Sequence, residues 1–106
     1  MSYFFPEKGT IYVIENQNTI IGYLTLINYW SNEYGGNLIF IDEIYINPRY
    51  RNKGIGSDII KTLTKQYINS CKAIQLEVLS SNLNAQKFYE KNGFKYLKNK
   101  LMIFEF

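Results

Sequence analysis

The spacing of apolar residues changes at a glycine-rich turn near the middle of this 106-residue chain. Before the turn, β-branched and aromatic residues dominate three segments, which predict strands at 11–14, 20–29 and 38–46. After it, apolar residues recur every three to five positions from Gly54 to Ser70, which predicts an amphipathic helix. We therefore expect a sheet packed against a helix, within a single domain over residues 1–106.

The rest of the chain alternates between the two patterns. Residues 73–79 predict a strand, and residues 83–92 predict a short helix that ends at Gly93. Segments 94–97 and 101–106 predict a closing hairpin around residues 98–100. The first three strands have short connections, which favour an antiparallel meander, and Gly22 is a candidate bulge. The predicted fold is α/β (α+β): a mixed, mostly antiparallel sheet with two main helices in the order β-β-β-α-β-α-β-β.

Composition excludes several classes of protein and site. The chain is 46% hydrophobic, which excludes disorder. It has no His and one Cys, Cys71, which excludes Cys/His zinc sites, Ser-His-Asp triads and an internal disulfide. We expect no metal site and a reducing, cytoplasmic location. No signal-peptide pattern and no apolar run of about 18 residues occurs, and a net charge of +3 makes nucleic acid an improbable partner.

The turn at residues 47–57 has the features of an anion-binding site. A strand, a glycine turn and a helix N-terminus bring free N–H groups together, and Arg49, Arg51 and Lys53 add positive charge. The turn fits neither the Walker loop nor the dinucleotide fingerprint, because Ile59 stands where the third Gly would be. The alternative is a structural turn that uses Gly for geometry and basic residues for solubility.

Two motifs resemble the GNAT superfamily of acyl-coenzyme-A-dependent N-acetyltransferases. The first is Arg51-x-x-Gly54-x-Gly56, with Ile44-Tyr-Ile-Asn-Pro48 before it. The second is Leu76-Glu-Val-x-x-x-Asn-x-x-Ala-x-x-Phe-Tyr-x-x-x-Gly-Phe94. The two motifs occur in the family's order and at its spacing, and together they span roughly residues 40–97.

The resemblance implies that acetyl-CoA is the acyl donor and that no metal is needed. It assigns the coenzyme pyrophosphate to the backbone amides of Arg51, Asn52, Lys53, Gly54, Ile55, Gly56 and Ser57. It also implies that the pantetheine arm pairs with the backbone of Ile44, Tyr45 and Ile46, in a cleft beside the strand at 74–79. Asn82 is expected to bond to the same arm, or to cap the helix that follows it.

The implied reaction is direct attack of a neutral amine on the thioester, with the oxyanion held by a backbone N–H such as that of Ile46. By its motif position, Tyr89 would protonate the departing thiolate. The alternative is a core ring beside Phe88. Glu77 is the candidate base, with Glu43 and Asp42 as further candidates. The alternative for Glu77 is a solvent-facing residue on an alternating strand.

The chain departs from the family pattern where the acceptor would bind. About ten residues precede Ile11, enough for an extended arm but not for the two helices usual in the family, and the closing hairpin is short. The acceptor is thus an amine of unknown identity. The alternative functions are a non-catalytic acyl-CoA-binding module that needs a partner, or one part of a longer or split protein. Open edge strands and abundant aromatic residues also favour a homodimer.

Overall fold

The computed structural model describes residues 2–5 and 9–106. The strands are β1 (Ser2–Phe5), β2 (Gly9–Asn16), β3 (Thr19–Ser31), β4 (Gly36–Ile46) and β5 (Ala73–Leu76). The helices are α1 (Ile55–Tyr67) and α2 (Leu83–Lys91), with a 3-10 turn η1 (Pro48–Tyr50) after β4. Within the described ranges, no helix is both long and apolar enough to cross a membrane.

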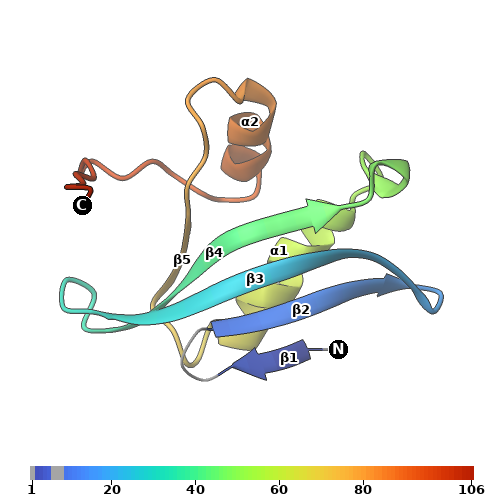
Figure 1. The fold of residues 1–106 in the computed structure, drawn as a ribbon, viewed down its shortest axis with the longest axis horizontal. Coiled ribbons are helices and arrows are strands. Elements are labelled where there is room, and N and C mark those ends of the chain that lie inside the picture. Colours follow the sequence, from blue (N-terminus) through green and yellow to red (C-terminus); the bar gives the residue numbers. More distant parts are fainter. Residues whose placement is uncertain (1, 6–8) are drawn as a thin grey trace.

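The five strands form one mixed sheet in the order β1-β2-β3-β4-β5. The first four strands are antiparallel, and β5 pairs with β4 in parallel. Figure 1 shows α1 behind the sheet and α2 beyond its β4–β5 edge. The predicted mixed, mostly antiparallel sheet with two main helices is confirmed.

The core lies between the sheet and α1. Leu24 and Leu26 of β3 and Ile39 and Ile41 of β4 are buried, as are Ile60 and Leu63 of α1. Ile60 and Leu63 are three positions apart and share one face of the helix, as the sequence period predicts. This packing fixes α1, and therefore its N-terminus, against the strands that approach it.

Two irregularities bend the strands near the end of β4. The β3–β4 register passes from Leu26↔Ile41 to Thr25↔Glu43, so that Asp42 is an extra residue in β4. The β2–β3 register skips Ile21, next to the predicted bulge at Gly22. A Cβ on Gly22 would lie 2.1 Å from the Tyr45 carbonyl oxygen, so the glycine is needed for the close approach of β3 and β4.

Three details differ from the sequence predictions. The extended arm before Ile11 contains strand β1 at residues 2–5, while residues 1 and 6–8 lie outside the described residues. Strand β5 ends at Leu76, three residues earlier than predicted. The closing hairpin predicted from 94–97 and 101–106 is wrong, because neither segment is a strand.

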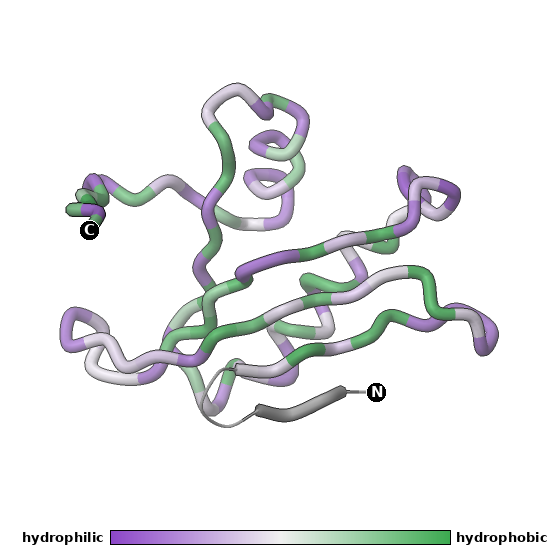
Figure 2. The backbone as a smooth tube through the Cα atoms, viewed as in Figure 1, coloured by the Kyte–Doolittle hydropathy of each residue, from purple (hydrophilic) through white to green (hydrophobic). Residues whose placement is uncertain are grey.

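The position of Tyr96 accounts for the missing hairpin. Its hydroxyl donates hydrogen bonds to Gln86 Oε1 (3.0 Å) and Glu90 Oε1 (3.1 Å), which hold the segment after α2 against that helix. A two-stranded hairpin has little stability of its own, so these tertiary contacts decide the path of the chain. Figure 2 shows that the chain then ends in a partly apolar segment away from the sheet.

Candidate active site

The β4–β5 ladder stops at the Ile41↔Leu76 pair, but β4 continues for five more residues to Ile46. The backbone N–H of Asn47, just after β4, donates a hydrogen bond to the carbonyl oxygen of Ile21 in β3 (2.6 Å). Because hydrogen-bonded and non-bonded pairs alternate along an antiparallel ladder, the N–H and C=O groups of Ile44 and Ile46 point to the opposite edge. That edge is the one that β5 leaves open.

The predicted anion turn begins where β4 ends. Gly54 is the N-cap of α1 with a left-handed backbone (φ 81°), and no side chain caps this end of the helix. The first N–H groups of a helix have no acceptor within it, so those of the first turn of α1 remain available as donors. A Cβ on Gly54 would meet nothing within 4 Å. No other residue therefore blocks the approach to Gly54 on the side where a side chain would stand.

Basic residues lie beside this turn. Arg51 Nε donates to the Ile46 carbonyl oxygen (2.7 Å), and the Arg51 guanidinium carbon is 5.5 Å from the centre of the Tyr45 ring. Lys53 Nζ is 5.7 Å from the centre of the Tyr50 ring. Both cations are exposed. They add positive potential to that of the helix N-terminus.

One aromatic ring of α2, that of Phe88, reaches the first turn of α1. A Cβ built on Gly56 would come within 2.9 Å of Phe88 Cζ, so the absence of a side chain at Gly56 admits the Phe88 ring. The sequence motif places Gly56 in the anion turn, and the structure gives it this packing role as well. Tyr89, which follows Phe88, is thereby fixed relative to the turn.

Tyr89 is a half-buried residue between two aromatic rings, at 5.2 Å from Phe88 and 5.6 Å from Phe94 between ring centroids. Burial raises the pKa of its hydroxyl. The ring also lines a cavity of about 1130 Å³. Tyr89 therefore packs beside Phe88, as the core-ring alternative predicts, and its ring also reaches the cavity.

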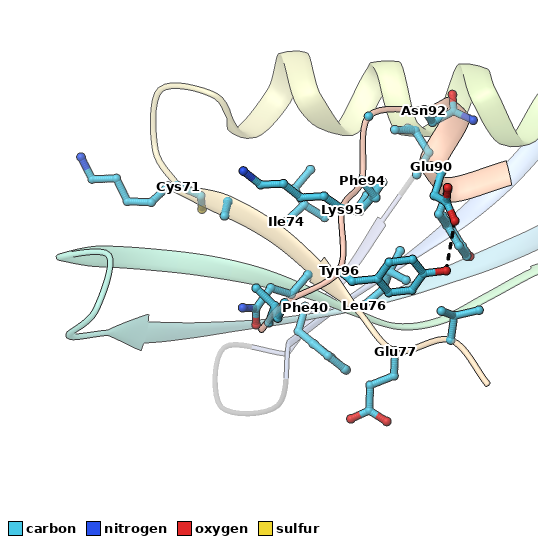
Figure 3. A pocket seen from close by; sticks show the side chains of 18 of the residues that line it. Phe40, Cys71, Ile74, Leu76, Glu77, Glu90, Asn92, Phe94, Lys95 and Tyr96 are labelled. Carbon is cyan, nitrogen blue, oxygen red and sulfur yellow. Dashed lines mark hydrogen bonds between the residues drawn. The ribbon is translucent and has the colours of Figure 1, made fainter. Parts of the chain in front are cut away.

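The cavity extends between β5, α2 and the segment that follows α2 (Figure 3). Glu77 contributes to its lining and is exposed. In Figure 3 its carboxylate points away from Ile74 and Phe94, as strand alternation predicts. Glu77 and Tyr89 therefore belong to one cavity, with Glu77 on its solvent side.

Asn82 caps α2. Its Oδ1 accepts a hydrogen bond from the Ala85 backbone N–H (3.1 Å), which confirms the N-cap interpretation. This bond does not use the side-chain Nδ2, which keeps its donor capacity. The two roles expected for Asn82 are therefore chemically compatible.

A cluster of three polar side chains, those of Tyr23, Glu43 and Tyr45, lies on the sheet face opposite α1. The sequence alone does not predict it. Tyr23 donates to Glu43 Oε2 (2.7 Å) and stacks on Tyr45 with ring centroids 5.5 Å apart. The Glu43 carboxylate raises the pKa of Tyr23. The exposed bulge residue Asp42 precedes Glu43. Only the strand register, with Tyr23 opposite Tyr45, brings these residues together.

Comparison with known proteins gives a family match. The model of the acetyltransferase (GNAT) family matches residues 2–94. A protein of Methanocaldococcus jannaschii named as an uncharacterized N-acetyltransferase is 34% identical over 86 residues, which are 79% of this chain and 51% of that protein. The thialysine N-epsilon-acetyltransferase of Bos taurus is 33% identical over 75 residues, which are 70% of this chain and 44% of that enzyme.

The fold has a close counterpart among solved structures. A possible acetyltransferase of Clostridium difficile superposes with a TM-score of 0.86 at 21% identity, over 96% of this chain and 68% of that one. By the sequence matches to the Methanocaldococcus jannaschii and Bos taurus proteins, the chain spans about half the length of its curated relatives.

Proposed function

This chain belongs to the acetyltransferase (GNAT) family, whose acyl donor is acetyl-CoA, and on that premise we propose that it transfers the acetyl group to a primary amine by direct attack. One observation carries the proposal. The open edge of β4 at Ile44 and Ile46 leads directly into the uncapped N-terminus of α1. A backbone edge next to an anion turn suits a donor with an amide-containing arm and a pyrophosphate.

In this proposal the pyrophosphate binds the backbone amides from Arg51 to Ser57. The helix N-terminus and the exposed side chains of Arg51 and Lys53 supply the positive charge. The open space at Gly54 supports this assignment, because an oxygen atom can approach the amides without meeting a side chain.

The pantetheine arm then lies along the open edge of β4. Its amides pair with the backbone of Ile44 and Ile46 as an added strand would, whereas the backbone of Tyr45, between them, faces β3. The carbonyl oxygen of Ile46 already accepts a hydrogen bond from Arg51. The backbone N–H of Ile46 is therefore the group of that residue that remains to bond a ligand. Nδ2 of Asn82 provides a further donor toward the arm.

The chemistry uses groups of the chain alone. The amine nitrogen attacks the thioester carbon, and a backbone N–H at the open edge of β4, that of Ile44 or Ile46, stabilises the oxyanion as it forms while the other N–H bonds to the arm. The C–S bond breaks, and Tyr89 gives its proton to the coenzyme thiolate. A tyrosine hydroxyl is protonated at neutral pH in any case. Burial raises the pKa of Tyr89, which makes transfer of its proton less favourable, so the transfer depends on holding the hydroxyl beside the thiolate. A cationic acceptor first releases one proton to water, so that the neutral amine attacks, and after the attack the nitrogen gives a second proton to Glu77 or Glu43 through water. Solvent then takes the proton from the carboxyl group and returns one to Tyr89, which restores the chain.

We propose a small aliphatic cationic amine as acceptor. Three exposed carboxylates, those of Asp42, Glu43 and Glu77, lie near the point where β4 and β5 separate, and negative charge there attracts a cation. The bovine relative is named for the amine thialysine. A lysine analogue of this kind fits the charge pattern.

A second candidate is a non-catalytic acyl-CoA-binding module. The observations that support acetyl transfer lie on the donor side, at the open edge of β4 and the turn before α1, and a module that only binds acyl-CoA would need the same two features.

The test is to incubate the purified chain with acetyl-CoA and a panel of thialysine, lysine and spermidine. We expect free thiol and an acetylated amine, with calorimetric binding of CoA that Gly54→Glu abolishes. The matched control, Gly35→Glu, changes another glycine that has open space around it and lies outside the turn. CoA binding without thiol release on any amine would favour the module, and absence of CoA binding would contradict both candidates.

A further inference from the structure

Gln86, in the middle of α2, has no role in the sequence motifs or in the proposed reaction. Its side chain is half-buried and lines the same cavity as Tyr89. Its Nε2 donates hydrogen bonds to the carbonyl oxygens of Leu79 and Ser80, both at 2.9 Å. Its Oε1 accepts a hydrogen bond from the Tyr96 hydroxyl at 3.0 Å. One amide group thus links α2 to the segment before it and to the segment after it.

The partners of Gln86 determine how its amide is turned. The two carbonyl oxygens can only accept hydrogen bonds, so the donor group Nε2 must face them, and Oε1 then faces the Tyr96 hydroxyl. If Oε1 and Nε2 exchanged places, an oxygen atom would lie against two carbonyl oxygens. Gln86 therefore has one fully bonded arrangement, which fixes the distance between the two segments that it joins.

Helix α2 depends on such contacts, because it has no buried face. None of its residues is buried, whereas α1 buries Ile60 and Leu63. An element with few buried apolar contacts is held by individual interactions and is among the first parts of a fold to open. The Phe88 ring at Gly56 is one such interaction, and the hydrogen bonds of Gln86 are another.

The bond to Tyr96 also acts on the surroundings of Tyr89. The Phe94 backbone N–H donates to the Tyr89 carbonyl oxygen at 3.0 Å, and the two rings meet edge to face. Two residues further along, the Tyr96 hydroxyl reaches Gln86 and Glu90, and Figure 3 shows the bond to Glu90. Residues 94–96 are thus fastened to α2 at both ends, with the Phe94 ring against Tyr89.

We propose that Gln86 is a positioning residue for Tyr89. By holding residues 79–80 and 94–96 on α2, it sets where the Tyr89 hydroxyl lies in the cavity, without touching the reacting atoms itself. The inference rests on the proposed function, in which Tyr89 protonates the coenzyme thiolate. Because a misplacement of about 1 Å can cost roughly 10²-fold in rate, loosening of α2 should lower kcat.

The first experiment is Gln86→Met, which keeps a long, flexible side chain and removes the amide. We expect kcat for thiol release to fall about tenfold or more. The Kd for acetyl-CoA should stay nearly unchanged, since the proposed donor contacts lie mainly on β4 and the turn before α1. Lys87→Met is the matched control, because Lys87 is the next residue of α2, is exposed and does not line the cavity. Native kcat in Gln86→Met would overturn the inference.

The second experiment shows whether Gln86 acts through Tyr89. In a Tyr89→Phe background there is no acidic proton to position, so adding Gln86→Met should lower kcat no further. Far-UV circular dichroism checks that each variant is folded. If Gln86→Met lowered kcat by the same factor with and without Tyr89, its role would be only structural, which contradicts the inference.

The third experiment does not depend on activity. The ring signals of tyrosine labelled with carbon-13 are recorded by NMR, and the Tyr89 signal is assigned by its loss in Tyr89→Phe. We expect this signal to shift in Gln86→Met and to keep its native position in Lys87→Met. An unmoved Tyr89 signal in Gln86→Met would overturn the inference. A shifted signal in a chain that releases no thiol with any amine would contradict the proposed function and support the placement of Tyr89 by Gln86.

Discussion

The ring of Phe88 occupies the space that a side chain on Gly56 would need, since a Cβ at Gly56 would lie 2.9 Å from Phe88 Cζ. Gly56 belongs to the first turn of α1 and Phe88 to α2. The two halves of the proposed site, the anion turn and the helix that carries Tyr89, are therefore in direct contact.

Gly56→Ala should destabilise the protein by about 1–2 kcal/mol, because overpacking outweighs the better helix propensity of Ala. Chemical denaturation measures the change. The double variant Gly56→Ala/Phe88→Leu should recover part of the loss, since Leu leaves room for the added methyl group. Additive effects of the two substitutions would argue against the contact.

Gly54→Ala should also destabilise the protein, by about 1–2 kcal/mol, but for a different reason. The space around Gly54 is open, so the cost is that of a left-handed backbone at φ 81°. Because Asn tolerates this conformation better, Gly54→Asn should be closer to the native stability. If Ala and Asn were equally harmful, backbone strain would not be the cause.

Substitutions at Asn82 should separate capping from ligand binding. Asn82→Ala removes the bond to the Ala85 N–H and should cost about 1 kcal/mol of stability. Asn82→Asp keeps a capping oxygen but has no Nδ2, so we expect near-native stability with weaker CoA binding. Denaturation and calorimetry measure the two effects. Native CoA affinity in Asn82→Asp would remove Asn82 from the coenzyme site.

Tyr89→Phe should lower kcat by about 10²-fold or more and leave the Kd for acetyl-CoA nearly unchanged, because only the acidic proton is lost. Tyr12→Phe is the matched control, since Tyr12 is a half-buried tyrosine that does not line the cavity. Thiol release at saturating acetyl-CoA gives kcat. Equal turnover in wild type and Tyr89→Phe would exclude this residue as the acid.

Stability should fall as the pH rises above about 10, and Tyr67 should contribute to that fall. Burial, together with the 2.8 Å hydrogen bond between the Tyr67 and Tyr12 hydroxyls, raises the pKa of Tyr67 above its ordinary value of about 10. The unfolded chain therefore releases this proton first. The stabilisation is complete below pH about 10 and is lost as the pH rises through the folded pKa.

Tyr67→Phe should lose less folding stability than wild type as the pH rises above about 10. At pH 8 the variant should be the less stable of the two proteins. Denaturation at several pH values measures the slope, and Tyr50→Phe, outside this hydrogen-bonded pair, is the control. Burial also raises the pKa of Tyr89, so part of the slope should remain. An unchanged slope in Tyr67→Phe would contradict the assignment.

The sequence predicts the elements that carry a long periodic pattern. The two helices begin and end within three residues of their predicted bounds, because their apolar residues lie on one face. Strand β1 has only four residues, too few to show a period. The predicted hairpin at 94–106 fails for another reason. Its residues suit strands locally, but the bonds of Tyr96 to α2 are tertiary and leave no local signal.

The distinction between local sequence patterns and tertiary contacts applies to the site as well. The turn at 51–57 and Tyr89 are candidates that the sequence alone supplies, because the spacing of their motifs is local. The cluster of Tyr23, Glu43 and Tyr45 depends on the register between two strands, which no spacing within one strand encodes. The residues that would bind the donor are therefore easier to predict than those that would meet the acceptor.

The extra residue at Asp42 determines which residues of β4 face solvent. Ile41 and Ile44 are three positions apart, yet they pair with Leu26 and Leu24, which are both buried. If β3 and β4 paired without this bulge, Glu43 would turn into the core and Ile44 out of it. Because Asp42 takes up the extra position, deleting it would leave a regular ladder in which Ile41 still lies opposite Leu26 and Ile44 opposite Leu24. The bulge thus adds one carboxylate to the outer end of β4 while its neighbours keep the faces that they would have in an uninterrupted strand.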